Sequence, residues 1–548
     1  MAHDQAPADI PLQRASWDAD RSVDLMDFTV GELLADRANA HPDRVAIVGV
    51  RHGTGEQTRL TYRQLYDEAN RVACALAGLA ERGSFIAIWA PNVIEWPIIQ
   101  YGAALAGMVL VAINPASREQ ELHYALRHSG SAVLLHADAN RDYDMAAVAR
   151  RAAANLPELT CVSLSDLSTW RAGAIKDLEE HLPRNARGDA RDVVMLQYTS
   201  GTTGNPKGVL LRHVSLINVA KLTFEALSVP DGGVCVNPLP MFHTAGCVIA
   251  TLGPLWIGGT VILIERFSPA RVLQALRTEK ASVLFYVPAV LAALLEAQRT
   301  SDASAPQLHT IMGGASNVSP TLIEAAEDVF GATVINLFGQ TELSPVLTAT
   351  RPEDSRADRL NTVGRPLPQV DCRIVDPATG EVVGLGESGE ICARGYQTFV
   401  GYLHDSEATA RTIDGEGFVH TGDLGTMDSR GFLTVTGRLK ELIIRGGENI
   451  APAEIESHLL SHDDVMECAV VGLPDDRLGE QAAAVLRTSR DADVLLKDSL
   501  LSHLRNRLAP FKIPARWFVV AEFPVTPTGK VRKFELRDAI LLGNVTEL

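Results

Sequence analysis

The stretch "YTSGTTGNPKGV", residues 198–209, places small hydroxyl side chains, three glycines and one lysine within a dozen positions. It lies between the apolar run "VVMLQ" and "VLLRHVSLINVAKLTF", which can form a helix. Glycines let backbone N–H groups turn toward an anion, and a strand, a glycine loop and a helix are typical of phosphate sites. The stretch therefore predicts a phosphate-binding loop. It is not a Walker loop, because Gly201 and Gly204 are three apart and Pro206 precedes Lys207.

Length and composition restrict the class of protein. A chain of 548 residues exceeds one hydrophobic core, so two or more folding units are expected. A net charge of -17 disfavours a nucleic-acid binder, although a local nest of N–H groups can still hold a small anion. The seven cysteines include no C-x-x-C pair, which favours buried thiols in a reducing, cytoplasmic setting. The N-terminus lacks an apolar signal region, and the uncharged run 248–264 is broken by glycines and a proline, so no membrane span is expected.

Apolar strands alternate with helical segments over the first four hundred residues. "RVAIVGV" at 44–50 and "SFIAIWA" at 84–90 are continuously apolar, as are five later runs. Such strands, separated by helices, predict parallel sheets covered on both faces. The helix expected after Thr61 presents one apolar face, formed by Leu65, Ala69, Val72, Ala73, Leu76 and Leu79.

The alternation of apolar strands with helical segments ends after about Gly364. Short strands separated by turn residues predict a β-rich subdomain, and the last hundred or so residues predict a small α+β unit. We therefore expect an α/β fold, with an N-terminal domain at 1–438 and a C-terminal domain at 439–548.

Four further motifs follow the loop in order. They are "FGQTE" at 338–342, "TGD" at 421–423, "GRLKELIIRGGENI" at 437–450 and "PTGKVRK" at 527–533. Together with the loop they resemble the AMP-forming adenylating superfamily, which includes acyl-CoA synthetases, aryl-CoA ligases, luciferases and peptide-synthetase adenylation domains. The resemblance is closest to acyl-CoA synthetases. It implies a large domain of stacked mixed and parallel sheets with flanking helices, and a small mobile C-terminal domain.

The resemblance implies a reaction in two halves. A carboxylate attacks the α-phosphate of ATP, giving acyl-AMP and pyrophosphate, and a thiol then attacks the acyl carbon and releases AMP. The cofactors implied are ATP, Mg2+ and CoA as co-substrate; the acid is a medium- or long-chain fatty acid or another bulky hydrophobic acid. The implied ATP and AMP contacts are Thr199, Ser200, Gly201, Thr202, Thr203, Gly204, Lys207, Gly314, Ala315, Phe338, Gly339, Gln340, Thr341, Asp423 and Arg438.

Several of these residues have individual roles by the same resemblance. Glu342 is the implied Mg2+ ligand, since hard oxygen donors beside phosphates suit Mg2+. Thr341 is expected to donate to the α-phosphate, and Phe338 to lie against the adenine ring. Asp423 is expected to bind the ribose, with Arg438 as its counterpart across the domain boundary.

The remaining roles concern the acid, the thiol and the movement between them. His243, in "PMFHTAG", is expected to orient the carboxylate, in an acyl pocket that also includes Gly313, Gly314 and Gly339. Lys530 is the implied catalytic lysine, carried by the small domain. Lys440 is the implied hinge, where a rotation can be concentrated in one residue. Gly446 and Gly447 are implied to line the pantetheine tunnel.

Alternatives remain open at this point. The acceptor could be a carrier-protein phosphopantetheine, with an aryl or natural-product acid as substrate, and a homodimer is a family-level expectation only. A carrier domain is not evident: the Asp-Ser-Leu in "KDSLLSHLRNRL" is interpreted as a helix start with Ser499 near the cap. A luciferase-like oxygenase would share every motif. A non-catalytic relative is expected to have lost Lys530, Glu342 or Lys207, and all three are present.

Overall fold

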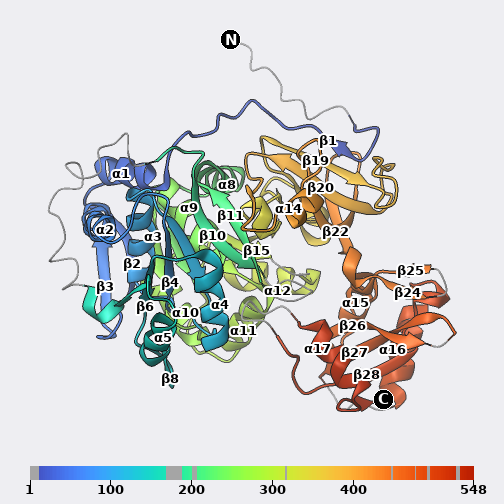
Figure 1. Cartoon of the computed structure of the whole chain (residues 1–548). Coiled ribbons are helices and arrows are strands. Elements are labelled where there is room, and N and C mark those ends of the chain that lie inside the picture. The colour runs from blue at the N-terminus through green and yellow to red at the C-terminus, as the bar shows by residue number, and fades with distance from the viewer. Residues whose placement is uncertain are drawn as a thin grey trace, which may run out of the picture.

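A computed structural model describes residues 11–167, 188–199, 206–314, 318–445, 448–475, 477–489, 494–505, 507–525 and 531–548. Within these ranges, a large body contains three extensive sheets, and a smaller unit at the C-terminal end has a sheet of its own. Figure 1 shows this unit (orange to red) beside the body, which the chain leaves at the end of strand β23 (Leu433–Arg438), the neighbour of β22 (Val419–Met427).

The first sheet of the body has seven strands, in the order β21-β11-β10-β5-β4-β6-β9. Strands β10, β5, β4, β6 and β9 run parallel, as their apolar sequences predict. In sheet order the strands span Gly401–Tyr402, Lys207–Arg212, Val193–Thr199, Val109–Ile113, Phe85–Trp89, Val133–His136 and Thr160–Ser163.

The second sheet has nine strands, in the order β18-β17-β16-β15-β14-β12-β13-β2-β3, and the six from β16 to β2 are parallel. At one end of the sheet, the two-residue strands β17 and β18 extend it, β17 antiparallel to β16 and β18 antiparallel to β17. At the other end, edge strand β3 pairs antiparallel with β2. In sheet order the strands span Arg365–Pro366, Thr348–Ala349, Thr333–Phe338, Thr310–Gly314, Val283–Tyr286, Val234–Asn237, Thr260–Leu263, Val45–Val50 and Gln57–Thr61.

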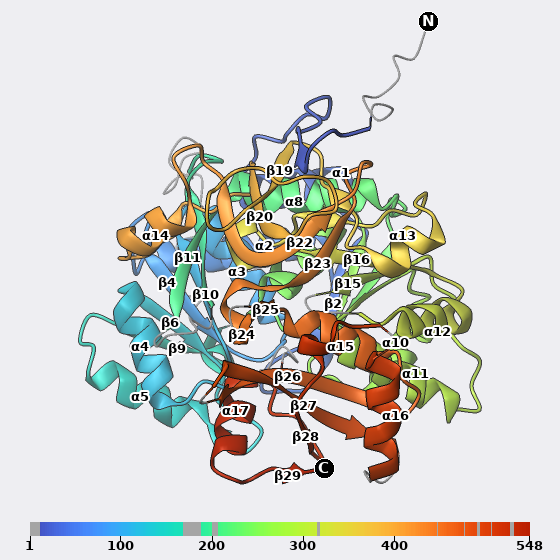
Figure 2. The same cartoon turned by 90° about the vertical axis from the view of Figure 1, so that its right-hand side faces the viewer.

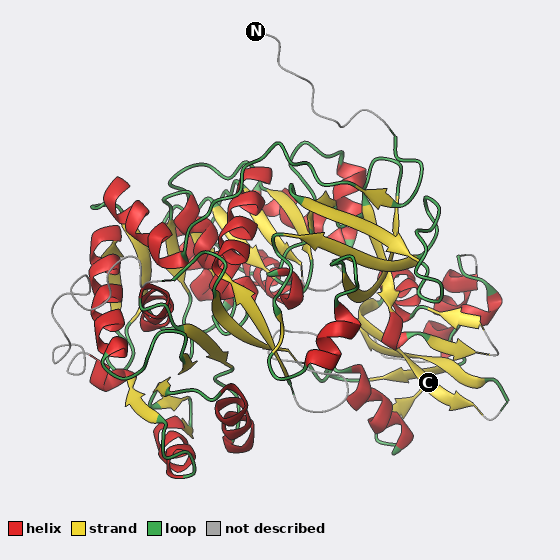
Figure 3. Cartoon of the chain, turned by 45° about the horizontal axis from the view of Figure 1, so that its top comes forward, coloured by secondary structure: helices red, strands yellow, loops and turns green. Residues whose placement is uncertain are grey.

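Helices cover both sheets, and one of them is buried all round. Every residue of α3 (Glu95–Leu105) is buried, because its sequence "EWPIIQYGAAL" is apolar on all sides apart from Glu95 and Gln100. Figure 3 shows the helices of the body (red) around its strands (yellow). The others are α1 (Val30–Ala40), α2 (Tyr62–Ala77), α4 (Glu119–Ser129), α5 (Met145–Ala154), α8 (His213–Ala226), α9 (Ala250–Trp256), α10 (Pro269–Thr278), α11 (Pro288–Arg299), α12 (Pro320–Phe330), α13 (Arg356–Asn361) and α14 (Ser406–Thr412).

The β-rich subdomain expected after Gly364 is a five-stranded antiparallel sheet, β1-β19-β20-β22-β23. Its edge strand β1 comes from the other end of the chain, at Ser16–Trp17, and pairs with β19. A two-residue strand is too short to show a periodic pattern, so the sequence did not predict this pairing. Strands β19, β20 and β23 span Val370–Val375, Gly389–Gly395 and Leu433–Arg438.

In the described part of the C-terminal unit, a sheet is combined with the helices α15, α16 and α17, which Figure 2 shows around it. Its strands have the order β25-β24-β27-β28-β29, and β26 pairs with β27. This is the small α+β unit that the sequence predicts. The strands β24 to β29 span Ile443–Arg445, Glu448–Ile450, Val465–Asp475, Gly479–Thr488, Arg516–Val519 and Thr546–Glu547, and the helices α15 to α17 span Pro452–Leu460, Val494–Arg505 and Lys533–Leu541.

The glycine loop lies in a different context from the one predicted. The segment after it, "KGVLLR", is strand β11 and not the start of a helix, and α8 begins only at His213. Thr199 of β10 pairs with Lys207 of β11 in an antiparallel hairpin. Residues 200–205, which connect the two strands in the sequence, lie outside the described residues. The prediction that a helix N-terminus follows the loop directly is therefore wrong.

Two smaller predictions are also wrong. Leu79 lies beyond the end of α2 and is 40% exposed, whereas the five other residues of the predicted apolar face are buried. Ser499 lies in the middle of α16, where its hydroxyl is 3.0 Å from Nε2 of His462, so it is not near the helix cap.

The predicted structure of the uncharged run and the predicted burial of the cysteines are confirmed. The run 248–264 contains α9 and β13, separated by Gly258 with its φ of +58°. None of the helices in the described part of the chain has the length and apolar character that a membrane crossing requires. All seven cysteines are free, and each is buried or partly buried.

Candidate active site

A buried carboxylate marks the place where the two large sheets meet. Glu342 lies in a 3-10 turn, Thr341–Leu343, that follows β16 of the nine-stranded sheet. Tyr402, in edge strand β21 of the seven-stranded sheet, donates its hydroxyl proton to Oε1 of Glu342 at 2.8 Å. The hydrogen bond therefore joins two sheets across this edge.

Lys207 approaches the same tyrosine from strand β11. Val209 lies opposite Tyr402 in the β11–β21 ladder, and Lys207 shares the face of Val209 because side chains alternate along a strand. The Nζ atom of Lys207 is 4.6 Å from the centre of the Tyr402 ring, a cation–π distance. The lysine at the end of the glycine loop and the predicted metal ligand thus contact one aromatic side chain.

The backbone around Glu342 is fixed by the segment that leads to Tyr402. The N–H of Phe399 donates to the carbonyl of Glu342 at 3.0 Å, and the Ser344 hydroxyl donates to the carbonyl of Gln397 at 2.7 Å. Burial raises the pKa of Tyr402, and the Glu342 carboxylate raises it further. The tyrosine therefore stays protonated at neutral pH and acts as a donor.

Asp423 and Arg438 form an ion pair across neighbouring strands. They lie opposite each other in the β22–β23 ladder, and Nε of Arg438 is 2.7 Å from Oδ1 of Asp423. The Asp423 side chain is 5% exposed and that of Arg438 is 50% exposed. The structure thus brings the two predicted ribose residues together, with the buried acid as the fixed member of the pair, and their role at the ribose stays a prediction.

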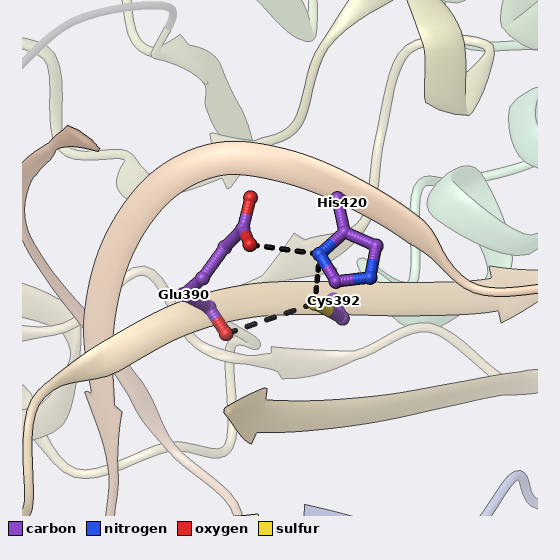
Figure 4. Close-up of side chains that lie close together, drawn as sticks. All are labelled: Glu390, Cys392 and His420. Carbon is purple, nitrogen blue, oxygen red and sulfur yellow. Dashed lines mark hydrogen bonds and ion pairs between the residues drawn. The ribbon is translucent and has the colours of Figure 1, made fainter. Parts of the chain in front are cut away.

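A glutamate that sequence reasoning missed holds the turn before Asp423. Figure 4 shows Glu390 beside His420 and Cys392. One carboxyl oxygen of Glu390 is 2.7 Å from Nδ1 of His420, and the other accepts the N–H of Gly422 at 2.9 Å. Gly422 has a φ of +71°, which favours glycine. Glu390 thus fixes the "TGD" turn from both sides.

The same three side chains could hold a metal by geometry alone, since their donor atoms lie within 4.8 Å of one another. The Cys392 sulfur is 3.5 Å from Nδ1 of His420. However, both oxygens of Glu390 already accept protein hydrogen bonds, and burial raises the pKa of the Cys392 thiol, so the thiolate that a metal requires is disfavoured. The cluster is explained as support for the turn.

His243 precedes the buried helical segment that leads into α9. Its Nδ1 accepts the N–H of Ala245 at 3.2 Å, so in the neutral imidazole the proton is on Nε2. The turn also carries a hydrogen bond from the His243 N–H to the carbonyl of Pro240. The backbone thus orients the ring and leaves Nε2 as its donor.

The glycines assigned to the acyl pocket are required by close backbone packing. A Cβ on Gly313 would lie 1.9 Å from the Tyr286 carbonyl oxygen, and one on Gly339 would lie 2.1 Å from that of Pro345. Gly314 has a φ of +153° and faces the Leu337 carbonyl equally closely. A side chain at any of these positions would displace a neighbouring strand or turn.

The other predicted residues fall into two groups. Gln340 and Thr341 lie between β16 and Glu342, and Phe338 ends β16. Lys440 is exposed in the 3-10 turn Leu439–Glu441, between β23 and β24. The residues that lie outside the described part of the chain are Ser200, Gly201, Thr202, Thr203, Gly204, Ala315, Gly446, Gly447 and Lys530.

Comparison with known proteins decides the family. The pattern described as AMP-binding enzyme matches residues 34–403, and the pattern described as AMP-binding enzyme C-terminal domain matches residues 454–530. The chain belongs to the AMP-binding enzyme family. The recognition of adenylating motifs in the sequence is therefore confirmed.

Individual members of the AMP-binding enzyme family resemble the chain over most of its length. YngI of Bacillus subtilis, provisionally named an acyl-CoA synthetase, is 35% identical over 94% of this chain and 98% of its own. The human mitochondrial medium-chain acyl-CoA ligase ACSF2 is 32% identical over 93% and 87%. The anthranilate CoA ligase AuaEII, solved with anthranoyl-AMP, has a TM-score of 0.84 at 25% identity over 94% and 98%.

These similarities confirm the expected α/β fold and the class of activity, which is ATP-dependent activation of a carboxylic acid followed by transfer to CoA. Two residues of the site escaped the sequence analysis, Tyr402 and Glu390. Each follows a glycine near a short strand, but no motif used in the analysis contains them. Only the pairing of strands β11, β20, β21 and β22 brings them to the site.

Proposed function

We propose that the chain is an AMP-forming ligase that converts a medium- or long-chain fatty acid, or another bulky hydrophobic monocarboxylic acid, to its CoA thioester. The observation that carries the proposal is the buried Glu342, hydrogen-bonded to Tyr402, whose ring also contacts the lysine that ends the glycine loop. An acid so placed can bind a cation that phosphates share. The relatives named for acyl-CoA ligation support the same assignment.

Glu342 is the residue that would hold Mg2+. A buried carboxylate that shares Tyr402 with Lys207 would offer a hard oxygen donor to an ion on the phosphates, and Mg2+ in nucleotide sites takes only one or two protein carboxylates. Bound there, the ion supplies neutralisation of phosphate charge. Lys207 adds a second cation at the hairpin, where it steadies the leaving pyrophosphate.

The nucleotide is held by groups from both sheets of this region and from the β-rich subdomain. Thr341 donates its hydroxyl to the α-phosphate, and Phe338 lies against the adenine. Asp423 accepts the ribose hydroxyls, and Arg438 orients that carboxylate through their ion pair. Residues 199–204, with Gly314, Ala315, Gly339 and Gln340, complete the contacts.

The acid enters beside His243, whose Nε2 proton orients the carboxylate. Residues 238–264 contain no Lys, Arg, Asp or Glu. A second carboxylate on the substrate would need a cation partner, so this uncharged segment favours a monocarboxylic acid with a hydrophobic chain. Gly313, Gly314 and Gly339 form part of the pocket wall.

The reaction proceeds by two displacements. A carboxylate oxygen of the acid attacks the α-phosphorus of ATP, the bond to the bridging oxygen breaks, and pyrophosphate leaves. Lys530 neutralises the approaching anions during this step. The CoA sulfur, after losing its proton, then attacks the acyl carbon, and the bond to the AMP oxygen breaks.

The second displacement requires the small domain, 439–548, to turn against the large one, 1–438. Lys440 is the hinge of that rotation, and Gly446 and Gly447 line the pantetheine tunnel. CoA is the acceptor proposed, with a carrier-protein thiol as the second candidate. The setting proposed is the cytoplasm, with a homodimer as the expected assembly.

The test is ATP-dependent AMP release over acids of two to eighteen carbons and over aryl acids, with CoA and then without it. We expect the highest kcat/KM on monocarboxylic acids of medium to long chain, with CoA required for multiple turnovers. Mass spectrometry identifies the product. A preference for acetate, a dicarboxylate or an aryl acid would contradict the substrate assignment, and the same test with a phosphopantetheinylated carrier protein decides the acceptor.

A further inference from the structure

We propose that Tyr402 is a positioning residue that sets how tightly the site holds its divalent cation, by fixing the carboxylate of Glu342. The inference rests on the proposed function, in which Glu342 is the metal ligand. It adds a residue that no motif of the sequence marks.

The first support is the direction of the hydrogen bond. The Tyr402 hydroxyl reaches Oε1 of Glu342 at 2.8 Å from a different sheet, so the carboxylate is oriented by a group that does not move with its own turn. A metal ligand fixed by an outer partner binds more tightly, and loss of such a partner typically lowers affinity or activity about 10- to 100-fold.

The second support is that the tyrosine ring is itself held in place. The ring of Phe399 packs edge-on against it, with ring centres 5.0 Å apart. The Tyr402 N–H donates to the Thr409 hydroxyl at 2.9 Å, which ties the strand to α14. A hydroxyl on so constrained a ring can define the position of the carboxylate.

The third support is the arrangement of charge around the ring. The ammonium group of Lys207 lies 4.6 Å from the ring centre, while the hydroxyl holds the anionic Glu342. Tyr402 therefore keeps the lysine and the carboxylate each in contact with itself rather than with each other. The two charges remain available for phosphate and metal respectively.

Two functions of one side chain can be separated by two substitutions. Tyr402→Phe keeps the ring, with its contacts to Lys207 and Phe399, and removes only the hydrogen bond to Glu342. Tyr402→Leu removes the ring as well. The matched control is Tyr62→Phe, since the buried Tyr62 hydroxyl also donates a hydrogen bond, to the Gly259 carbonyl. Gly259 directly precedes β13, which the strands β15, β14 and β12 separate from β16 in the nine-stranded sheet.

The experiment measures binding, not turnover. Equilibrium dialysis of the full chain with radiolabelled ATP, without any acid, gives one Kd in EDTA and one with Mn2+. The Kd in EDTA divided by the Kd with Mn2+ reports how much the metal strengthens ATP binding. We expect this ratio to fall about 10-fold or more in Tyr402→Phe, with the Kd in EDTA unchanged. Tyr402→Leu lowers the ratio too and also changes the Kd in EDTA, because Lys207 loses its ring. Tyr62→Phe leaves both values unchanged.

Glu342→Gln separates the two proposals. If Glu342→Gln brings the ratio of the two Kd values to about one while Tyr402→Phe leaves it at the wild-type value, the role of Tyr402 is wrong and the metal assignment stands. If Glu342→Gln itself leaves the ratio unchanged, the metal assignment is wrong, and the role of Tyr402 fails with it. Thermal melting curves identify any variant that has not folded.

Discussion

The site in the large body and the junction to the small unit differ in how firmly their charged groups are held. Glu342 and Asp423 are buried and hydrogen-bonded, whereas Arg438 is half exposed and Lys440 is exposed. The small unit also has hydrophobic clusters of its own, formed by residues from Ile443 onward. Fixed groups suit a nucleotide held through both half-reactions, and a separate core suits a unit that turns.

The largest effect is expected where the two regions must act together. Lys530→Ala removes the cation that we propose acts at the α-phosphate, and should lower ATP–pyrophosphate exchange about 10²- to 10³-fold. Thioester formation from supplied acyl-AMP should stay within a few-fold of wild type. Lys530→Arg is the control for charge without the lysine geometry. An equal loss in both half-reactions would contradict the assignment of Lys530 to adenylation alone.

The converse effect is expected at the pantetheine tunnel. Gly447→Leu would place a bulky side chain in the proposed path of the thiol, and an error of about 1 Å in position can lower a rate roughly 10²-fold. Adenylation, measured as pyrophosphate exchange, should be spared. Gly447→Ala should give an intermediate rate of thioester formation, because it adds only one methyl group. Normal thioester kinetics in the leucine variant would contradict the assignment.

The buried member of the β22–β23 ion pair should matter more for ATP than the exposed one. Asp423→Asn leaves Arg438 without its anion and removes the charged acceptor that we propose for the ribose hydroxyls. A charged hydrogen bond contributes about 1.5–3 kcal/mol, so the Kd for ATP should rise by about one to two orders of magnitude. Isothermal titration with ATP measures it, and an unchanged Kd would exclude Asp423 as the ribose partner.

The smallest effect is expected at the exposed member. Arg438→Gln removes a guanidinium that is half in solvent, and exposed pairs contribute about 0–1 kcal/mol. The Kd for ATP should change less than about five-fold, measured by the same titration. A larger rise in the Kd for ATP in Arg438→Gln than in Asp423→Asn would contradict the view that the buried group contributes more to ATP binding than the exposed one.

The sequence predicted the parts of the fold that are set by local pattern. Runs such as "VCVN" and "TVIL" are continuously apolar, and they form parallel strands buried on both faces. The segment "KGVLLR" shows the limit. Its residues fit either a helix or a strand, and pairing with β10 on one side and β21 on the other decides for the strand.

The site was predicted as far as its residues belong to motifs. Glu342, Asp423, Arg438 and Lys207 were named from short strings, and the structure brings Glu342 and Lys207 to one tyrosine and pairs Asp423 with Arg438. Tyr402 and Glu390 were missed because their roles come from long-range pairing, sixty residues from Glu342 in one case. The signal that could have found Tyr402 is the tyrosine in "GY" followed by a capped helix, which is weak alone.

The most direct test of the account measures both half-reactions in both Lys530→Ala and Gly447→Leu. Pyrophosphate exchange reports adenylation, and release of AMP from supplied acyl-AMP with CoA reports thioester formation. The account predicts a crossed result, in which Lys530→Ala loses the first reaction and keeps the second, and Gly447→Leu does the reverse. Parallel losses in both variants would show that the two half-reactions share one fixed site, and would contradict the account.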